Sequence, residues 1–270
     1  MKPSRNLAKT ASLALLMVLL SACGTPEPAP TPTFAPTPAI AIELVALGDS
    51  TPAAYGVVDS YVDLYAKYIE TDLGVAVRVH NWARGGQHAA ELLSVLQSVQ
   101  SLRDEIREAE VITIWTGMND IFVGVGTKPK GGACGNWEGL DIDCAAARVK
   151  RLKGNIDAII AEIFSLVSPA ETLILNSDVG NPHAKQWKEM GLLDQLKGPM
   201  MEEWIDHIAE AAEQNNVQVV HTYRVINGPN GDDQGAPPGI LQADGFHFNG
   251  EGHRLLAGLH RQVGYGPLQP

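Results

Sequence analysis

The chain has 270 residues, of which 45% are hydrophobic and 19% are charged, and its formal net charge is −11. This acidic balance argues against binding to nucleic acid and against flat adsorption on anionic lipid, because both partners are themselves negatively charged. The length is sufficient for one large domain with its own hydrophobic core.

Residues 1–22 are typical of a secretory signal. Three basic residues precede the apolar run ASLALLMVLL, residues 11–20, which is short for a membrane-spanning helix. The run leads into Leu-Ser-Ala-Cys, ending at Cys23, and this resembles the bacterial lipobox, in which cleavage leaves the cysteine as a lipid-carrying N-terminus. An ordinary signal peptide followed by a chance cysteine is the alternative interpretation.

Residues 23–39 are predicted to form a tether. Six of the sixteen residues in GTPEPAPTPTFAPTPA, residues 24–39, are proline. A stretch with so little apolar content cannot pack, and it favours an extended, polyproline-like conformation. We expect an exported protein that is anchored by lipid on Cys23 to the bacterial cell membrane or cell envelope. The tether would hold a single domain, residues 40–270, clear of that surface.

From residue 42 onward, short apolar runs alternate with segments of helical periodicity. Strand and helix alternate five times, which is typical of a parallel sheet with helices on both faces. The sequence therefore predicts an α/β domain with a doubly wound sheet of about five parallel strands in three layers. The predicted strands are 42–47, 75–81, 111–117, 172–177 and 217–223, and the predicted helices are 60–74, 88–110, 147–167, 198–216 and 249–263.

The segment 121–143 after the third strand contains six glycines and no helical period. Cys134 lies in this Gly-rich loop and Cys144 lies at its end, ten residues later. Because an exported compartment permits disulfides, we predict a local bridge between them. A metal site is the alternative, but no histidine lies near either cysteine. The segment is expected to lie over the carboxyl edge of the sheet, either as a lid or substrate wall that presents Phe122 and Trp137 or as a decorative loop.

Polar residues follow the predicted strands at their carboxyl ends, where open α/β sheets bind ligands. Gly48-Asp49-Ser50 follows the first strand, residues 81–86 (NWARGG) the second, and residues 117–120 (GMND) the third. Asp244 and His247 lie three residues apart just before the last helix. Together these stretches supply a hydroxyl, glycine amides, a side-chain amide, an imidazole and a carboxylate, which are the groups that acyl transfer needs. Residues 178–187, after the fourth strand, are a further candidate wall.

These four stretches, in this order, resemble blocks I, II, III and V of the SGNH/GDSL hydrolases, and the resemblance extends over most of residues 42–263. Thr51 stands where the family name places leucine, at a position without a chemical role. The resemblance implies the flavodoxin-like fold of that family. It also implies a serine ester hydrolase that works through an acyl-enzyme intermediate.

The expected catalytic residues follow from the same four stretches. Ser50 would be the nucleophile and His247 the base that takes its proton, since a serine hydroxyl is a poor nucleophile on its own. Asp244 would hold the imidazole in the correct tautomer and stabilise its charged form. Taken alone, each stretch is a weak signal, and an ordinary turn or a solvated loop is the alternative interpretation.

The resemblance also implies an oxyanion hole with three donors. These are the backbone N–H groups of Ser50 and Gly86 and the side-chain amide of Asn119. Glycine suits this role, because a side chain would block close approach of the backbone. The residues alone do not separate Gly85 from Gly86, and we prefer Gly86 because it lies five positions after Asn81, which is the family's spacing.

Several other polar residues are assigned structural roles. Asp49 and Asp120 are expected to accept backbone hydrogen bonds that shape the turns after their strands. His253 is interpreted as a packed histidine within the last helix, and His88 as a surface histidine at a helix start rather than a site residue. The sequence has no convincing metal-ligand spacing and no nucleotide-binding motif, so we expect no metal and no cofactor.

The substrate is predicted only by class. Small-molecule or polysaccharide esters with short acyl chains, such as O-acetyl groups, are the first hypothesis, and long-chain acyl esters such as lysophospholipids are the second. A non-catalytic surface domain that binds carbohydrate or lipid on the same fold is the alternative from a different class. We expect a monomer that binds no nucleic acid.

Overall fold

A computed structural model of the chain describes residues 41–125, 132–136, 139–181, 184–189, 191–231 and 234–268. The predicted signal, Cys23 and the tether lie outside these described residues, and so does Trp137. The described part of the chain begins with the first strand, at Ala41.

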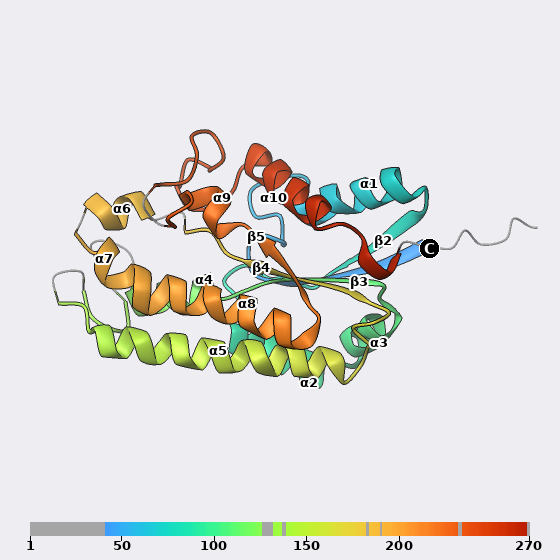
Figure 1. Cartoon of the computed structure of the whole chain (residues 1–270), viewed down its shortest axis with the longest axis horizontal. Helices are drawn as coiled ribbons and strands as arrows, with labels where there is room; N and C mark the ends of the chain where they lie inside the picture. The colour runs from blue at the N-terminus through green and yellow to red at the C-terminus, as the bar shows by residue number, and fades with distance from the viewer. Residues whose placement is uncertain are drawn as a thin grey trace, which may run out of the picture. The chain divides into compact units, whose positions relative to one another are not determined.

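Five parallel strands form one sheet, in the order β2-β1-β3-β4-β5 (Figure 1). The central strand β3 reads VITIW and is buried along its whole length, as expected for a β-branched, uncharged run covered on both faces. The predicted parallel sheet is therefore confirmed. The strands are β1 (Ala41–Gly48), β2 (Ala76–Asn81), β3 (Val111–Trp115), β4 (Leu173–Asp178) and β5 (Gln218–His221).

Helices cover both faces of this sheet, which confirms the three-layer, doubly wound architecture (Figure 1). One face carries α1 (Tyr61–Leu73) and α10 (Gly250–Val263). The opposite face carries α2 (Ala89–Ser98), α3 (Gln100–Glu108), α5 (Ile142–Phe164) and α8 (Glu203–Asn215).

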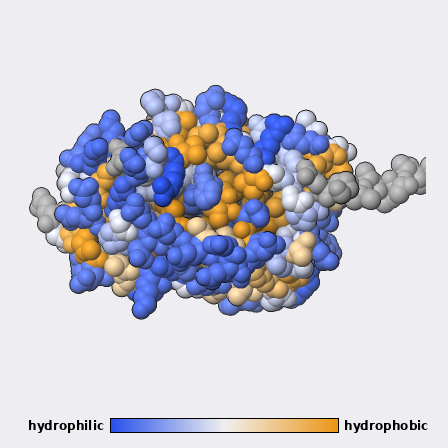
Figure 2. Space-filling model, viewed as in Figure 1, coloured by the Kyte–Doolittle hydropathy of each residue, from blue (hydrophilic) through white to orange (hydrophobic). Residues whose placement is uncertain are grey.

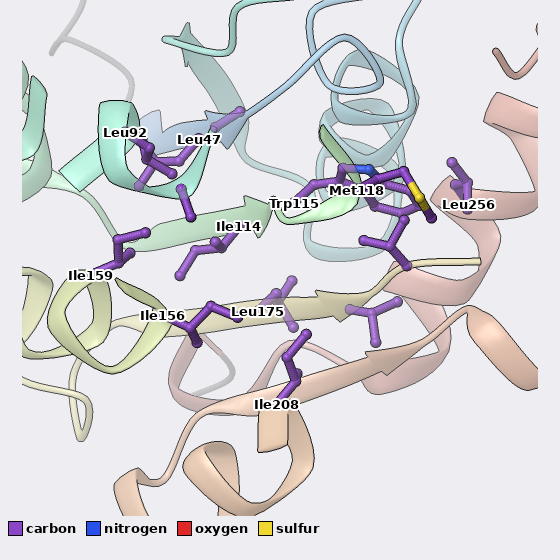
Figure 3. Close-up of a cluster of buried hydrophobic side chains, with 14 of the residues drawn as sticks. Leu47, Leu92, Ile114, Trp115, Met118, Ile156, Ile159, Leu175, Ile208 and Leu256 are labelled. Atoms are coloured by element: carbon purple, nitrogen blue, oxygen red, sulfur yellow. The ribbon is translucent and has the colours of Figure 1, made fainter. Parts of the chain in front are cut away.

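The core lies between the sheet and these two helical layers. Figure 3 shows Leu92 of α2, Ile156 of α5 and Ile208 of α8 gathered against the strands. Each of these side chains is buried, and burying one contributes about 1.5–3 kcal/mol to folding. This packing fixes the carboxyl ends of the strands, from which the predicted site residues emerge.

Two of the predicted helices differ from the structure. The helix expected over 88–110 is broken at Val99, whose backbone is extended (φ −96°, ψ 104°), a conformation that β-branched residues favour. The helix expected over 198–216 begins with a π-helical segment, η1 (Lys197–Glu202), before α8. The shorter elements that the prediction omitted are α6 (Ala184–Glu189), α7 (Leu193–Leu196), α9 (Tyr223–Asn227) and the 3-10 helix η2 (Gly266–Leu268).

The segment 121–143 is not the wholly irregular loop that was predicted. Helix α4 (Met118–Val125) begins directly after β3, and buried Met118 and Ile121 anchor it one turn apart. Helix α5 begins at residue 142, earlier than predicted, because the Asp141 side chain caps it by accepting from the Cys144 N–H (2.9 Å). The predicted Cys134–Cys144 disulfide is confirmed, although Cys144 lies in the first turn of α5 rather than in a loop.

The surface is mostly hydrophilic on the face shown in Figure 2, in keeping with the acidic composition. Hydrophobic residues on this face gather between the two helical layers, where Figure 1 shows the edge of the sheet. Within the part of the chain that the structure describes, no helix is long and apolar enough to cross a membrane.

Candidate active site

Ser50 lies in a tight turn directly after β1. Gly48 has φ +142°, and a Cβ there would lie 2.0 Å from the Trp115 carbonyl oxygen, so the turn requires glycine at this position. The Asp49 N–H donates to that same carbonyl (3.2 Å). The Asp49 carboxylate accepts from the Thr51 N–H (3.1 Å), which confirms its predicted role in shaping the turn. Ser50 is largely buried in this arrangement.

His247 and Asp244 lie on one loop before α10. The Asp244 Oδ2 atom lies 2.7 Å from the His247 Nδ1 atom, and Oδ1 accepts from the backbone N–H groups of Phe246 (2.9 Å) and His247 (3.0 Å). Partial burial acts to raise the pKa of Asp244, but the hydrogen bonds from His247 and Phe246 outweigh it, and the pKa is lowered. The carboxylate therefore stays charged beside the imidazole. The Asn249 side chain caps α10 and holds the end of this loop.

Ser50 and His247 line the same cavity, although 197 positions separate them in the sequence. The cavity is small, with a volume of about 20 Å³. Residues from four segments of the chain form its walls: Asp49, Ser50, Thr51, Trp115, Met118, Val179, Gly180, Phe246, His247 and Phe248. Because Val179 and Gly180 belong to the predicted wall after the fourth strand, that prediction is confirmed for these two residues.

The two stretches expected to supply oxyanion donors besides Ser50 lie beside the Ser50 turn. A Cβ on Gly85 would lie 3.9 Å from the Ser50 Cβ, so this glycine is a close neighbour of Ser50. The N–H of Gly86 belongs to the peptide that follows Gly85, and Gly86 has φ +76°, which favours glycine. The Asn119 side-chain nitrogen donates to the Gln87 carbonyl (3.1 Å) and lies 3.4 Å from the Asp49 Oδ2 atom. The choice of Gly86 over Gly85 stays a prediction.

Two carboxylates lie near this turn, Asp49, which is buried, and Asp120, which is partly buried. Burial raises the pKa of Asp49 to about 7, and the neighbouring Asp120 carboxylate adds to the rise. Burial likewise raises the pKa of Asp120, which accepts from the Ala89 N–H (3.0 Å) and so ties α4 to the start of α2. Near neutral pH, the protonation of Asp49 is therefore linked to folding.

Replacing Asp49 by asparagine is expected to remove a pH dependence of stability. An unfolded aspartate has a pKa near 3.9, so between about pH 4 and pH 7 the folded wild type holds a proton that the unfolded chain releases. The free energy of unfolding of the wild type, minus that of D49N, should fall across this window by at most about 1.4 kcal/mol per pH unit. Urea unfolding of both proteins at pH 4.5, 6 and 8 measures this difference, and a constant difference would contradict the assignment.

Gln242 joins the Ser50 loop to the His247 loop, and sequence reasoning missed it. Its backbone N–H donates to the His247 carbonyl (2.8 Å). Its side-chain nitrogen donates to the carbonyls of Tyr55 (2.7 Å) and Phe248 (2.9 Å). Tyr55 in turn donates its N–H to the Ser50 carbonyl (3.1 Å). A lone glutamine two residues before an aspartate carries no sequence signal for such a contact.

The remaining histidines of interest have structural positions. His253 is buried in α10, and its Nδ1 atom accepts from the Tyr61 N–H (3.0 Å). Burial lowers the pKa of His253 to about 4, so the ring is neutral, as expected for a packed histidine. His88 lies at the N-cap of α2, with its Nδ1 atom 3.8 Å from Asp120. Across the described ranges, no three His, Cys, Asp or Glu side chains form a group suited to a metal ion.

Three solved structures with the same fold are a lipase and two esterases. A lipase from a goat rumen metagenome has a TM-score of 0.64 and 21% identity, with 84% of this chain and 100% of that chain covered. An acetyl xylan esterase from Geobacillus stearothermophilus has a TM-score of 0.57 and 16% identity, covering 83% and 95%. A psychrotrophic esterase from Pseudoalteromonas, solved with monoethylphosphonate as inhibitor, has a TM-score of 0.53 and 15% identity, covering 82% and 95%.

The family of the chain is established by its sequence. No curated protein matches the chain. The model of the GDSL-like lipase/acylhydrolase family, however, matches residues 44–259. This range includes the Ser50 turn, the glycine stretch 81–86, the asparagine stretch 117–120 and the Asp244–His247 loop. The chain therefore belongs to the GDSL-like lipase/acylhydrolase family and is a carboxylic ester hydrolase.

Proposed function

We propose that this protein hydrolyses esters through a Ser50–His247–Asp244 triad. The observation that carries the proposal is that Ser50 and His247 line one cavity, while Asp244 holds the Nδ1 side of the imidazole at 2.7 Å. With Nδ1 occupied as a donor to the carboxylate, the Nε2 atom is the proton acceptor. Asp244 stabilises the imidazolium that forms during attack.

The reaction has two steps. The Ser50 hydroxyl attacks the ester carbonyl carbon as its proton passes to His247, and the tetrahedral intermediate then expels the alcohol, which takes that proton. A water molecule next gives a proton to His247 and attacks the acyl-enzyme. The acid is released, and the proton returns to Ser50. The bonds and protons of these two steps balance without an oxidant, a metal or a cofactor.

Three donors are proposed to stabilise the oxyanion: the N–H groups of Ser50 and Gly86 and the Asn119 amide. An amide nitrogen carries two hydrogens, and one of these is held by the Gln87 carbonyl (3.1 Å). Donation to the oxyanion would replace the longer 3.4 Å contact between Asn119 and Asp49. One donor of this kind is worth about 10²–10³-fold in kcat.

Short acyl groups are the proposed substrates. The cavity beside Ser50, at about 20 Å³, has room for little more than one water molecule or a methyl group. Its walls include the large apolar side chains of Trp115, Met118 and Phe248. An acetyl group fits this space, whereas a longer acyl chain would have to extend beyond it.

A series of p-nitrophenyl esters tests this assignment. We expect kcat/KM to be highest for acetate and to fall from butyrate to octanoate, because each added methylene must find space outside the cavity. Replacing Met118 by alanine should move the optimum toward longer chains. An optimum at octanoate in the wild type would reject the short-chain assignment in favour of a long-chain acyl ester hydrolase.

We propose that the protein acts while anchored by lipid on Cys23, beyond the signal-like residues 1–22 and ahead of the proline-rich stretch 24–39. Export to an oxidising compartment would also allow the Cys134–Cys144 disulfide to persist. In cells that make the full chain, wild-type protein should fractionate with membranes and C23A should not. Equal membrane association of the two would contradict the anchor.

A further inference from the structure

Tyr55 is a large apolar side chain that lies exposed at the candidate active site. Its ring centroid is 4.2 Å from that of the His247 imidazole, with an interplanar angle of 34°. Even so, 55% of the residue remains open to solvent. Phe246 packs edge-on against the same imidazole at 4.8 Å. The base is thus flanked by two aromatic rings, one that lines the cavity and one that faces outward.

The backbone around Tyr55 holds it in this place. Ala54 has φ +58°, a left-handed conformation that non-glycine residues rarely adopt. Gly56 has φ +74°, and a Cβ there would lie 2.4 Å from the Gln242 side-chain oxygen. The Tyr55 N–H donates to Ser50, and its carbonyl accepts from Gln242. The position of the exposed ring is therefore fixed by a turn with defined hydrogen bonds. Residues with an unusual backbone conformation, like Ala54 here, cluster at functional sites.

The chemistry of the reaction indicates which part of the ester the Tyr55 ring contacts. His247 must return its proton to the departing alcohol, so the alcohol part of the ester lies against the imidazole. On the proposed short-acyl assignment, the acyl part enters the cavity whose walls include Trp115, Met118 and Val179. Tyr55 lies against the imidazole but is absent from the residues that line this cavity. Its open surface therefore faces the alcohol and not the acyl group.

We infer that Tyr55 is a specificity-determining residue that binds the alcohol part of the substrate, and that it takes a ring alcohol such as an O-acetylated sugar. The inference rests on the proposed triad. An aromatic face gains from stacking on a flat apolar surface, which the C–H face of a pyranose ring provides, while the sugar hydroxyls stay in water at its rim. An acyclic alcohol as small as ethanol offers too little surface for this contact.

The test holds the acyl group constant and varies the alcohol. We would measure kcat/KM for ethyl acetate, cyclohexyl acetate and mono-acetylated xylobiose with wild type, Y55A, Y55L and Y55F. Y55A and Y55L should lose about 3- to 10-fold on the two ring alcohols and less than twofold on ethyl acetate, whereas Y55F should match the wild type. Val58, 96% exposed on the same loop, supplies the control V58A, which should match the wild type on every ester.

Equal loss on all three alcohols, or no loss on any, would overturn the inference. Equal loss together with a shifted acid limb of the pH profile would instead mark Tyr55 as a positioning residue for His247. If the wild type hydrolyses butyrates but not acetates, the short-acyl proposal fails separately. The same three alcohols, as butyrates, then still report on Tyr55. If the wild type hydrolysed none of these esters, the triad proposal itself would be rejected, and this inference with it.

Discussion

The S50A variant is expected to lose about 10⁴- to 10⁶-fold in kcat for p-nitrophenyl acetate while keeping its fold. The hydroxyl is the proposed nucleophile, and triad members removed from serine hydrolases cost this much because no other group forms the acyl-enzyme. Removing one oxygen from a turn that is fixed by backbone contacts of Gly48 and Asp49 should leave the structure intact. Initial rates and far-UV circular dichroism of both proteins measure the two parts of this prediction.

The matched control for S50A is S98A, which removes a hydroxyl from the exposed end of α2. It should keep wild-type activity. If S50A retained more than about one hundredth of the wild-type rate, an acyl-enzyme on Ser50 would be ruled out and the hydrolysis would need another nucleophile.

Replacing His247 by alanine should lower kcat by a similar factor, about 10⁴- to 10⁶-fold. Without the imidazole, the Ser50 proton has no acceptor and the leaving alcohol has no donor. The two losses should not add, since a lone serine and a lone histidine are each ineffective. The double variant S50A/H247A should therefore be about as slow as either single variant.

H221A is the matched control for H247A. His221 also contacts an aspartate, with its Nδ1 atom 3.1 Å from Asp178, and its side chain is 68% exposed at the end of β5. It should keep nearly full activity. A loss of less than tenfold in H247A would show that Ser50 is not activated by this imidazole.

The fold was predictable because its periodicity is local. Each buried strand is a short apolar run, as in β3, and each long helix has apolar residues three and four apart, as at Ile156 and Ile159 of α5. Where a local signal was weak, the prediction failed. The helix break at Val99 involves neither glycine nor proline, which are the usual signals for a break. Helix α4 was divided between the stretch 117–120 and the segment 121–143, so its few apolar residues showed no helical period.

The candidate site was predictable only in part. The strand-end rule brings Ser50 and Asn119 to one edge of the sheet, because parallel strands end together. The loop of His247 lies well beyond the end of β5 at His221, so its expected place rested on the family resemblance. Val179 and Gly180 were predicted as part of the cavity wall, but its aromatic part was not predictable. Trp115 and Phe248 read as ordinary core residues and meet through packing, with 6.1 Å between their ring centroids. Tyr55 and Gln242 were missed for a related reason. The Gln242 side chain contacts the backbone carbonyl of Tyr55, 187 positions away, and any residue type can supply a backbone carbonyl, so the sequence carries no signal for this contact.

Labelling with a fluorophosphonate tests the central claim most directly, because the reagent reacts only with an activated hydroxyl. Peptide mass spectrometry of the labelled protein should place the adduct on Ser50, with activity lost in proportion to labelling. H247A should react far more slowly, because its Ser50 hydroxyl has no base. A protein that stays active without an adduct, or that carries the adduct on a residue other than Ser50, would contradict the account.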